Sequence, residues 1–178
     1  MHCTNGKLKK WQPSTRLPTR ADGRCIYMLG DVFDAVQKRP WETTQSLSPA
    51  VLKARRQAMR AVLERYIIGA HLNFNVDMKE LGSLKPDSSM QGFWEFRSGL
   101  PVEQTRLFGF FARPGAFLAT SFQPRGKFGG MSDPAWKVER EEGEKRWRAL
   151  FGDKEYIKMP WPVASKDQFF QYLDRKDD

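Results

Sequence analysis

Four cationic side chains stand at the ends of three short apolar segments in the middle of the chain. Arg97 ends the first segment, Arg106 begins the second, and Arg125 and Lys127 follow the third in a glycine-containing loop. Adjacent strands would bring these cations together, and they would repel one another unless an anion lay between them. Arginine binds phosphate through paired hydrogen bonds, so the pattern predicts a contact with a phosphate backbone. Nearby aromatic side chains could stack bases.

The same cations also have structural explanations. Arg106 has fewer acidic residues near it in the sequence and is the strongest candidate for an anion contact. Arg125 and Lys127 could be ordinary surface charges, since both residue types are mostly exposed in proteins. Arg97 could instead pair with a carboxylate, such as Glu80, Glu103 or the Glu95 of a neighbouring chain.

Other kinds of chemistry find little support in the sequence. The chain has no P-loop, GxGxxG, GxSxG or HExxH motif. Its two histidines, His2 and His71, are far apart, and neither Cys3 nor Cys25 belongs to a CxxC or Cys/His cluster. We therefore expect no metal site and no small-molecule cofactor. Free thiols are typical of a reducing cytoplasm, so a cytoplasmic protein is expected.

Composition and charge limit the class of partner. The chain has 178 residues, is 40% hydrophobic and carries a formal net charge of +9. This charge favours a polyanionic partner such as nucleic acid, the ribosome or an acidic protein, although a generically basic protein is the alternative. No stretch approaches the roughly 20 apolar residues of a membrane span, and no apolar segment follows the basic N-terminus, so neither a membrane contact nor a secretory signal is expected.

The elements that would position these cations are three strands and two helices. Residues 92–122 contain three alternating segments, the last two joined by the turn-like sequence Arg113-Pro114-Gly115, and short connections predict an antiparallel meander. Ser48 followed by proline begins a helix at about 49–68, and Asp133 followed by proline begins another at about 134–150. These helices would cover the sheet, which gives an α+β fold.

The two ends of the chain differ from this central region. Residues 1–47 are expected to form an irregular arm or small subdomain, with one short strand at 25–29 and a helical turn at 31–36. This arm could cover the basic face as a built-in inhibitor or offer a surface to a partner. Residues 48–151 form the main domain, and 152–178 are a C-terminal extension.

A family resemblance lies in the central region, over about residues 50–150. Its marks are a lysine–acid–leucine triplet, a strand with tryptophan, glutamate and arginine, an arginine that opens the next strand, an apolar third strand and a basic loop. The chain resembles the RelE/ParE toxin superfamily in these features, most closely the phage-derived HigB-like toxins, which implies a small twisted antiparallel sheet packed by N-terminal helices. The residues concerned are Lys79-Glu80-Leu81, Trp94-Glu95-Phe96-Arg97, Arg106-Leu107-Phe108 and Phe117-Leu118-Ala119-Thr120-Ser121-Phe122.

The resemblance implies a toxin of a type II toxin–antitoxin system that cleaves mRNA on the ribosome without a metal ion. Its partners would be mRNA, the ribosome and a cognate antitoxin. In such chemistry the ribose 2′-hydroxyl attacks the adjacent phosphate, and cations stabilise the developing charge. The family pattern assigns catalytic roles to Arg106, which matches the strand arginine at the scissile phosphate, and to Arg125 and Lys127 of the basic loop. Further nucleic-acid contacts are expected at Arg97, although the family position is usually structural, and at Arg113, Lys137 and Arg140.

Three departures from the family pattern keep other functions open. The basic loop reads PRGK instead of a paired lysine, Phe93 and Glu95 stand where RelE carries lysines, and no tyrosine or histidine follows the loop where some members keep a base. One alternative is a ParE-type gyrase inhibitor on the same fold. The other is a non-catalytic RNA- or DNA-binding protein that has kept the fold and lost the base.

Overall fold

The computed structural model describes residues 8–13, 24–37, 48–81, 89–99 and 104–158. It contains a single open sheet of six strands in the order β1-β2-β6-β5-β4-β3. The strands are β1 (Lys9–Lys10), β2 (Cys25–Met28), β3 (Met78–Glu80), β4 (Trp94–Arg97), β5 (Thr105–Arg113) and β6 (Ala116–Pro124). The helices are α1 (Gly30–Gln37), α2 (Pro49–Ile67), α3 (Ala135–Phe151) and a 3-10 turn, η1 (Arg125–Lys127).

The α+β class and the central meander are confirmed. The three expected strands, β4, β5 and β6, follow one another as antiparallel neighbours, and β3, which was not expected from the sequence, pairs with β4 as a fourth. Both expected helices are present within a residue or two of their predicted bounds. Ser48 caps α2 by accepting a hydrogen bond from the Val51 N–H at 3.4 Å, and the Asp133 carboxylate accepts one from the Ala135 N–H at 2.8 Å at the start of α3.

The expectation of a small, purely antiparallel sheet is wrong in size and in pairing. Strand β2 lies beside β6 and runs parallel to it, with Ile26 opposite Phe117, and β1 pairs antiparallel with β2. Parallel neighbours need a long crossover, and here the chain passes through α1, α2, β3, β4 and β5 before β6 returns to the side of β2. The strand expected at 25–29 and the helical turn at 31–36 are confirmed as β2 and α1.

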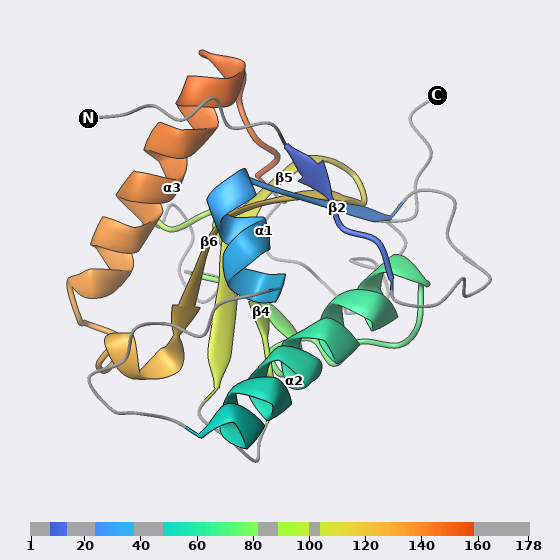
Figure 1. Cartoon of the computed structure of the whole chain (residues 1–178). Helices are drawn as coiled ribbons and strands as arrows, with labels where there is room; N and C mark the ends of the chain where they lie inside the picture. Colours follow the sequence, from blue (N-terminus) through green and yellow to red (C-terminus); the bar gives the residue numbers. More distant parts are fainter. Residues whose placement is uncertain (1–7, 14–23, 38–47, 82–88, 100–103, 159–178) are drawn as a thin grey trace.

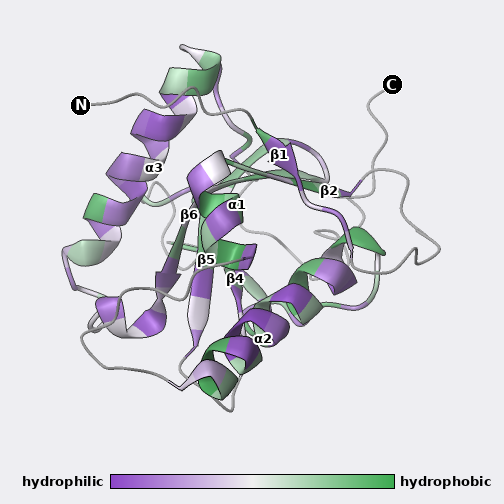
Figure 2. Cartoon of the chain, viewed as in Figure 1, coloured by the Kyte–Doolittle hydropathy of each residue, from purple (hydrophilic) through white to green (hydrophobic). Residues whose placement is uncertain are grey.

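Helices cover both faces of the sheet (Figure 1). Helices α1 and α2 lie on one face, where they enclose the larger core, and α3 lies on the other. Because side chains alternate along a strand, β4 directs Trp94 and Phe96 into the first core, whereas Phe93, just before it, belongs to the core under α3. Figure 2 shows hydrophilic residues interleaved with hydrophobic ones along α2 and α3, as expected for helices with one face on a sheet.

The long β5–β6 hairpin carries an irregularity that shapes the α3 face. The pairing register shifts between Phe108 and Gly109, so that Thr120 has no direct partner across the hairpin. A side chain at Gly109 would collide with the Leu118 carbonyl, so only glycine fits where the two backbones approach closely. Beyond the shift, Arg106 lies opposite Gln123 near the open end of the hairpin.

Several expectations concern segments outside the described residues. These are most of the N-terminal arm, Glu103 as a partner of Arg97, and the extension after residue 158. Among the described parts of the arm, β2 and α1 pack against β6 and α2 in the core on the face opposite α3. Among the described residues, no helix has the length and apolar character needed to cross a membrane.

Candidate functional site

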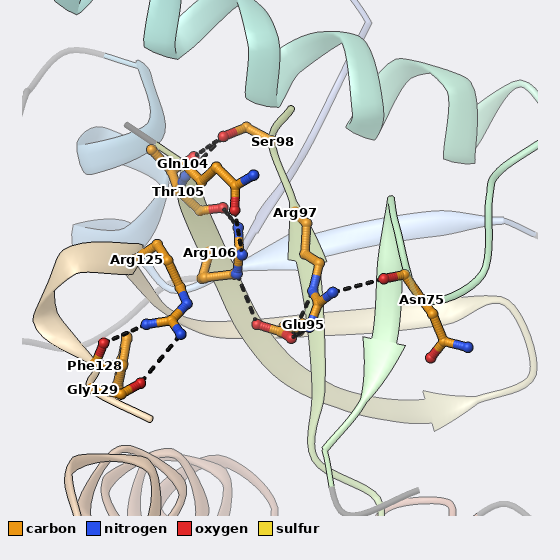
Figure 3. A network of polar contacts seen from close by, with 10 residues as sticks. All are labelled: Asn75, Glu95, Arg97, Ser98, Gln104, Thr105, Arg106, Arg125, Phe128 and Gly129. Atoms are coloured by element: carbon orange, nitrogen blue, oxygen red, sulfur yellow. Dashed lines mark hydrogen bonds and ion pairs between the residues drawn. The ribbon is translucent and has the colours of Figure 1, made fainter. Parts of the chain in front are cut away.

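Two of the four predicted cations, Arg97 and Arg106, meet around a carboxylate from the same chain. Glu95 is fully buried, and its Oε1 accepts hydrogen bonds from Nε of Arg97, at 2.7 Å, and from Nη2 of the same guanidinium. On the other side, Nε of Arg106 lies 3.1 Å from Glu95 Oε2 in an ion pair that lacks hydrogen-bond geometry. Figure 3 shows the carboxylate between the two guanidinium groups.

This arrangement follows from strand periodicity and register. Glu95 and Arg97 are two residues apart on β4 and therefore share a face of the sheet. Arg97 lies directly opposite Arg106 on β5, so the two cations are neighbours on the α3 side. The repulsion that the sequence predicts is thus offset by a carboxylate within the chain, and no partner copy is needed to supply it. Glu80, another partner considered for Arg97, instead accepts the Gly92 N–H at 2.7 Å.

Arg106 is almost completely enclosed. Its Nη1 donates to the Thr105 carbonyl at 3.0 Å and its Nη2 to the side-chain oxygen of Gln104 at 2.7 Å. Burial lowers the pKa of Arg106 to about 10; the Glu95 carboxylate opposes this shift, whereas Arg97 and Arg125 add to it. The side chain remains charged at neutral pH. Fewer acidic residues lie near Arg106 in the sequence, yet in the structure the Glu95 carboxylate is its immediate neighbour.

Arg125 approaches the same region from η1, which follows β6. Its guanidinium donates to the carbonyls of Phe128 and, at 3.2 Å, Gly129, and it lies 5.3 Å from the centre of the Trp136 ring. Asp133 closes the loop by accepting the Gly129 N–H at 2.6 Å. The hydrogen bond from the Ala135 N–H, together with this one, lowers the pKa of the Asp133 carboxyl. The loop that carries Arg125 is therefore fixed by its own hydrogen bonds.

Lys127, the fourth predicted cation, pairs with a carboxylate on α3. Its Nζ lies 2.7 Å from Oε2 of Glu139, a buried carboxylate on α3, while the lysine side chain remains 44% exposed. Gln123 donates to the other oxygen of Glu139 at 3.3 Å. Gln123 of β6 and Lys127 of η1 are thus both joined to α3 through Glu139.

We call Glu95, Arg97, Arg106, Arg125, Lys127 and Glu139 the cation cluster. Its four cations and two carboxylates leave a surplus of two positive charges. Arg97 and Lys127 have partly exposed side chains, at 23% and 44%, whereas Arg106 and Glu95 lie beneath them. Such a surface can bind a phosphodiester through its outer cations, while the buried pair holds the strands in place.

Three further residues expected to contact nucleic acid lie outside this cluster. Arg113 is at the far end of β5, next to the turn that leads to β6. Arg140 pairs with Glu144 at 2.8 Å and donates to the Tyr156 hydroxyl at 2.8 Å. Lys137 lies on an exposed side of α3, 3.7 Å from the Glu141 carboxylate.

The sequence interpretation missed several members of the site's contact network, among them Glu139 and Asn75. Glu139 falls on the same side of α3 as Trp136, Gly143 and Trp147, so its helical spacing could have revealed that it faces the sheet. Asn75, whose carbonyl accepts a hydrogen bond from Arg97 Nη1 at 2.6 Å, follows α2 in a turn that carries no comparable pattern. Within the described part of the chain, no group of three or more metal-ligating side chains is assembled.

Comparison with known proteins adds no relative. No family model matches the chain, and neither a curated protein nor a solved structure matches it. The fold, the cation cluster and the residues that carry the resemblance are therefore the features that bear on function.

Proposed function

We propose that the protein is a toxin of a type II toxin–antitoxin system, a RelE/HigB-like endoribonuclease that cleaves mRNA on the ribosome without a metal ion. The observation that supports this proposal is the cation cluster, in which partly exposed cations surround a rigid, buried Glu95–Arg106 pair. An mRNA strand, the ribosome and a cognate antitoxin are the proposed partners.

In the proposed reaction, the ribose 2′-oxygen attacks the adjacent phosphorus and the bond from phosphorus to the 5′-oxygen breaks. The 2′-hydroxyl proton leaves as the new bond forms, and the departing 5′-oxygen takes up a proton. Negative charge grows on the phosphoryl oxygens in the transition state, and fixed cations stabilise it without reorganising. Arg97, Arg125 and Lys127 would supply this stabilisation.

Arg106 has a different place in this proposal from the one the family resemblance implies. Its side chain is only 5% exposed and all its described contacts are internal. It would therefore act on the substrate through Glu95 and Arg97, by fixing the carboxylate that orients the outer guanidinium. The resemblance assigns Arg106 a direct contact with the scissile phosphate, and such a contact would require the groups that enclose this side chain to move.

The test is cleavage of a defined mRNA on translating ribosomes. We expect cuts with the wild-type protein and about 100-fold fewer with Arg125→Gln, because loss of one fixed transition-state donor costs roughly that factor. Lys145→Gln is the matched control, since it removes one positive charge from an exposed site on α3 outside the cluster. Equal cleavage by the wild type and by Arg125→Gln would remove Arg125 from the site.

A second candidate function is RNA binding without cleavage. It is favoured by one observation, that the described contacts of the cation cluster include no imidazole or phenol that could transfer a proton. Such a protein would bind single-stranded RNA with a steep salt dependence and leave it intact. A protein that stops DNA synthesis before protein synthesis, with mRNA uncut, would instead be a ParE-type gyrase inhibitor.

A further inference from the structure

The turn at Asn73–Asp77 lies between α2 and β3 and is held in place by an ion pair. Both oxygens of the Asp77 carboxylate accept hydrogen bonds from Arg65 of α2, at 2.8 and 3.1 Å. One of these oxygens also accepts the Asn73 N–H at 2.8 Å, which closes the turn. The carboxylate is 11% exposed, so this two-point contact is largely sheltered from water.

The same turn holds Arg97 from the side opposite Glu95. The Asp77 carbonyl accepts the Arg97 backbone N–H at 2.8 Å, and the Asn75 carbonyl accepts Arg97 Nη1 at 2.6 Å. Asn75 has a φ of 68°, a left-handed conformation that non-glycine residues rarely adopt. Its N–H donates to the Met78 carbonyl at 2.7 Å, so hydrogen bonds on both sides of Asn75 maintain this conformation.

Arg97 is therefore held between Glu95 of β4 and the Asn73–Asp77 turn, and some of its guanidinium N–H groups are not used by these two contacts. Nε and Nη2 donate to Glu95 and Nη1 donates to Asn75 (Figure 3). A guanidinium has five N–H groups, so two remain for a ligand after these three contacts with described residues. The direction of those two N–H groups is fixed only while both the carboxylate and the turn stay in place.

We propose that Arg65 and Asp77 are positioning residues for Arg97, which they hold through the Asn75 carbonyl in the orientation that meets an RNA phosphate. The inference rests on the proposed function for the identity of the ligand. It names two residues that neither the sequence pattern nor the cation cluster includes. The alternative role of the Arg65–Asp77 pair is purely structural, a bond that ties the end of α2 to the start of β3.

A double-mutant cycle of Asp77→Asn and Arg97→Gln separates the two roles. Affinity for a short single-stranded RNA is measured over a range of salt concentrations for both single variants and for the double variant. Each neutralised phosphate contributes about 0.7 to the slope of log affinity against log salt for single strands. We expect both single variants to lose 3- to 10-fold in affinity and about 0.7 in slope, and the double variant to lose no more than either.

Two control variants distinguish a specific loss of RNA affinity from a general loss of structure. Asp34→Asn breaks the half-exposed Lys9–Asp34 pair, which lies in the region of β1 and α1, and should leave RNA affinity unchanged. Arg65→Lys keeps the charge but cannot form two parallel hydrogen bonds, so its affinity should fall between wild type and Asp77→Asn. Because the Arg65 side chain is 39% exposed, this variant should fold even if Asp77→Asn does not.

Thermal unfolding tests, without RNA, whether Asp77 holds Arg97 in place. It is measured for the wild type, for Asp77→Asn, for Arg97→Gln and for the double variant. If Asp77 holds Arg97, the two substitutions lower the melting temperature by less in combination than the sum of their separate effects. Additive losses, in melting temperature or in RNA affinity, would overturn the inference. A wild-type protein that binds no RNA at low salt would overturn the proposed ligand, while a non-additive unfolding cycle would still support the link between Asp77 and Arg97.

Discussion

The two faces of the sheet are built from the same strands but have opposite chemistry. The face under α1 and α2 is packed with aromatic and aliphatic side chains; Phe96, for example, lies edge-to-face with Tyr66 and Phe117 at centroid distances of 5.0 and 4.9 Å. The face under α3 is apolar around Phe110 and Trp147 but charged at its other end, where Glu95 and its arginine partners lie.

Under the proposed function, the apolar face serves folding and the charged end of the α3 face serves binding. Burying apolar area stabilises a fold directly, at about 25 cal/mol per Å². A buried ion pair gains much less, because the desolvation of both charges offsets their attraction, and replacing the pair by apolar residues is often neutral or stabilising. The charged end of the α3 face is therefore poorly explained by stability and is better explained by a ligand.

The largest effect on folding is expected from Phe96→Ala. It removes a fully buried ring from the α1/α2 core and should lower the free energy of unfolding by about 4 kcal/mol. Denaturant titration measures this loss, and Val138→Ala, at an exposed position on α3, should change it by less than about 0.5 kcal/mol. RNA affinity per folded molecule should be unchanged in Phe96→Ala, and a large loss of affinity would contradict the division between the two faces.

A slightly smaller loss is expected from Glu95→Gln, on the opposite face of the same strand. The neutral amide cannot balance the positive charges of two guanidinium groups, one of which is almost fully buried. The free energy of unfolding should therefore fall by about 3 kcal/mol. The double variant Glu95→Leu with Arg106→Leu removes both buried charges and should recover most of this stability while RNA affinity stays low. If Glu95→Gln were as stable as wild type, Glu95 would not be the anion that holds the arginines together.

Lys127→Gln should affect binding far more than stability. Its pair with Glu139 joins a 44% exposed lysine to a buried carboxylate that also accepts a hydrogen bond from Gln123, so the free energy of unfolding should fall by less than in Glu95→Gln. RNA affinity should fall, and the salt slope should decrease by about 0.7, as expected for one lost phosphate contact. Lys145→Gln, with an equal change of charge, should alter neither quantity; equal losses in the two variants would indicate that net charge alone governs binding.

The smallest expected effect is a pH dependence of stability caused by Glu80, which is not part of the cation cluster. Burial raises the pKa of Glu80, although the hydrogen bond from the Gly92 N–H acts in the opposite direction. The folded state therefore binds the proton more readily than the unfolded state, and Glu80 lowers stability increasingly as pH rises through its folded pKa. Glu80→Gln keeps an oxygen that can accept the Gly92 N–H and should be more stable than wild type at neutral pH. This advantage should disappear in acid, and Glu155→Gln, at an exposed carboxylate, should show no such difference.

Much of the fold could be predicted from local patterns. Alternation along β4, β5 and β6 gave the meander, and a hydroxyl or carboxylate before proline marked the starts of α2 and α3. The parallel pairing of β2 with β6 could not be predicted, because it joins Cys25 to Ala116 and no local pattern records so distant a partner. The size of the sheet was underestimated for the same reason.

The site shows a similar limit. Arg97 and Arg106 meet because the strand register places them opposite each other. Glu95 is two residues before Arg97 on the same strand, so this spacing already placed its carboxylate on the same face as both arginines. What the sequence could not show is that Arg106 is enclosed, since burial depends on how the η1 loop and α3 close over the sheet. The clamp from Asn75 and Asp77 depends on a single left-handed residue, which a polar turn sequence does not specify.

The central claim is that the charged end of the α3 face, and no other cationic surface, binds RNA. The most direct measurement is the change in backbone amide chemical shifts of isotope-labelled protein on addition of a short single-stranded RNA. We predict that the largest changes fall at residues 95–97 and 125–129, with little change at Arg113, Arg140 and Tyr156. Changes centred on the latter three residues, or on α2, would contradict the assignment of the site, and no change at low salt would contradict RNA as its ligand.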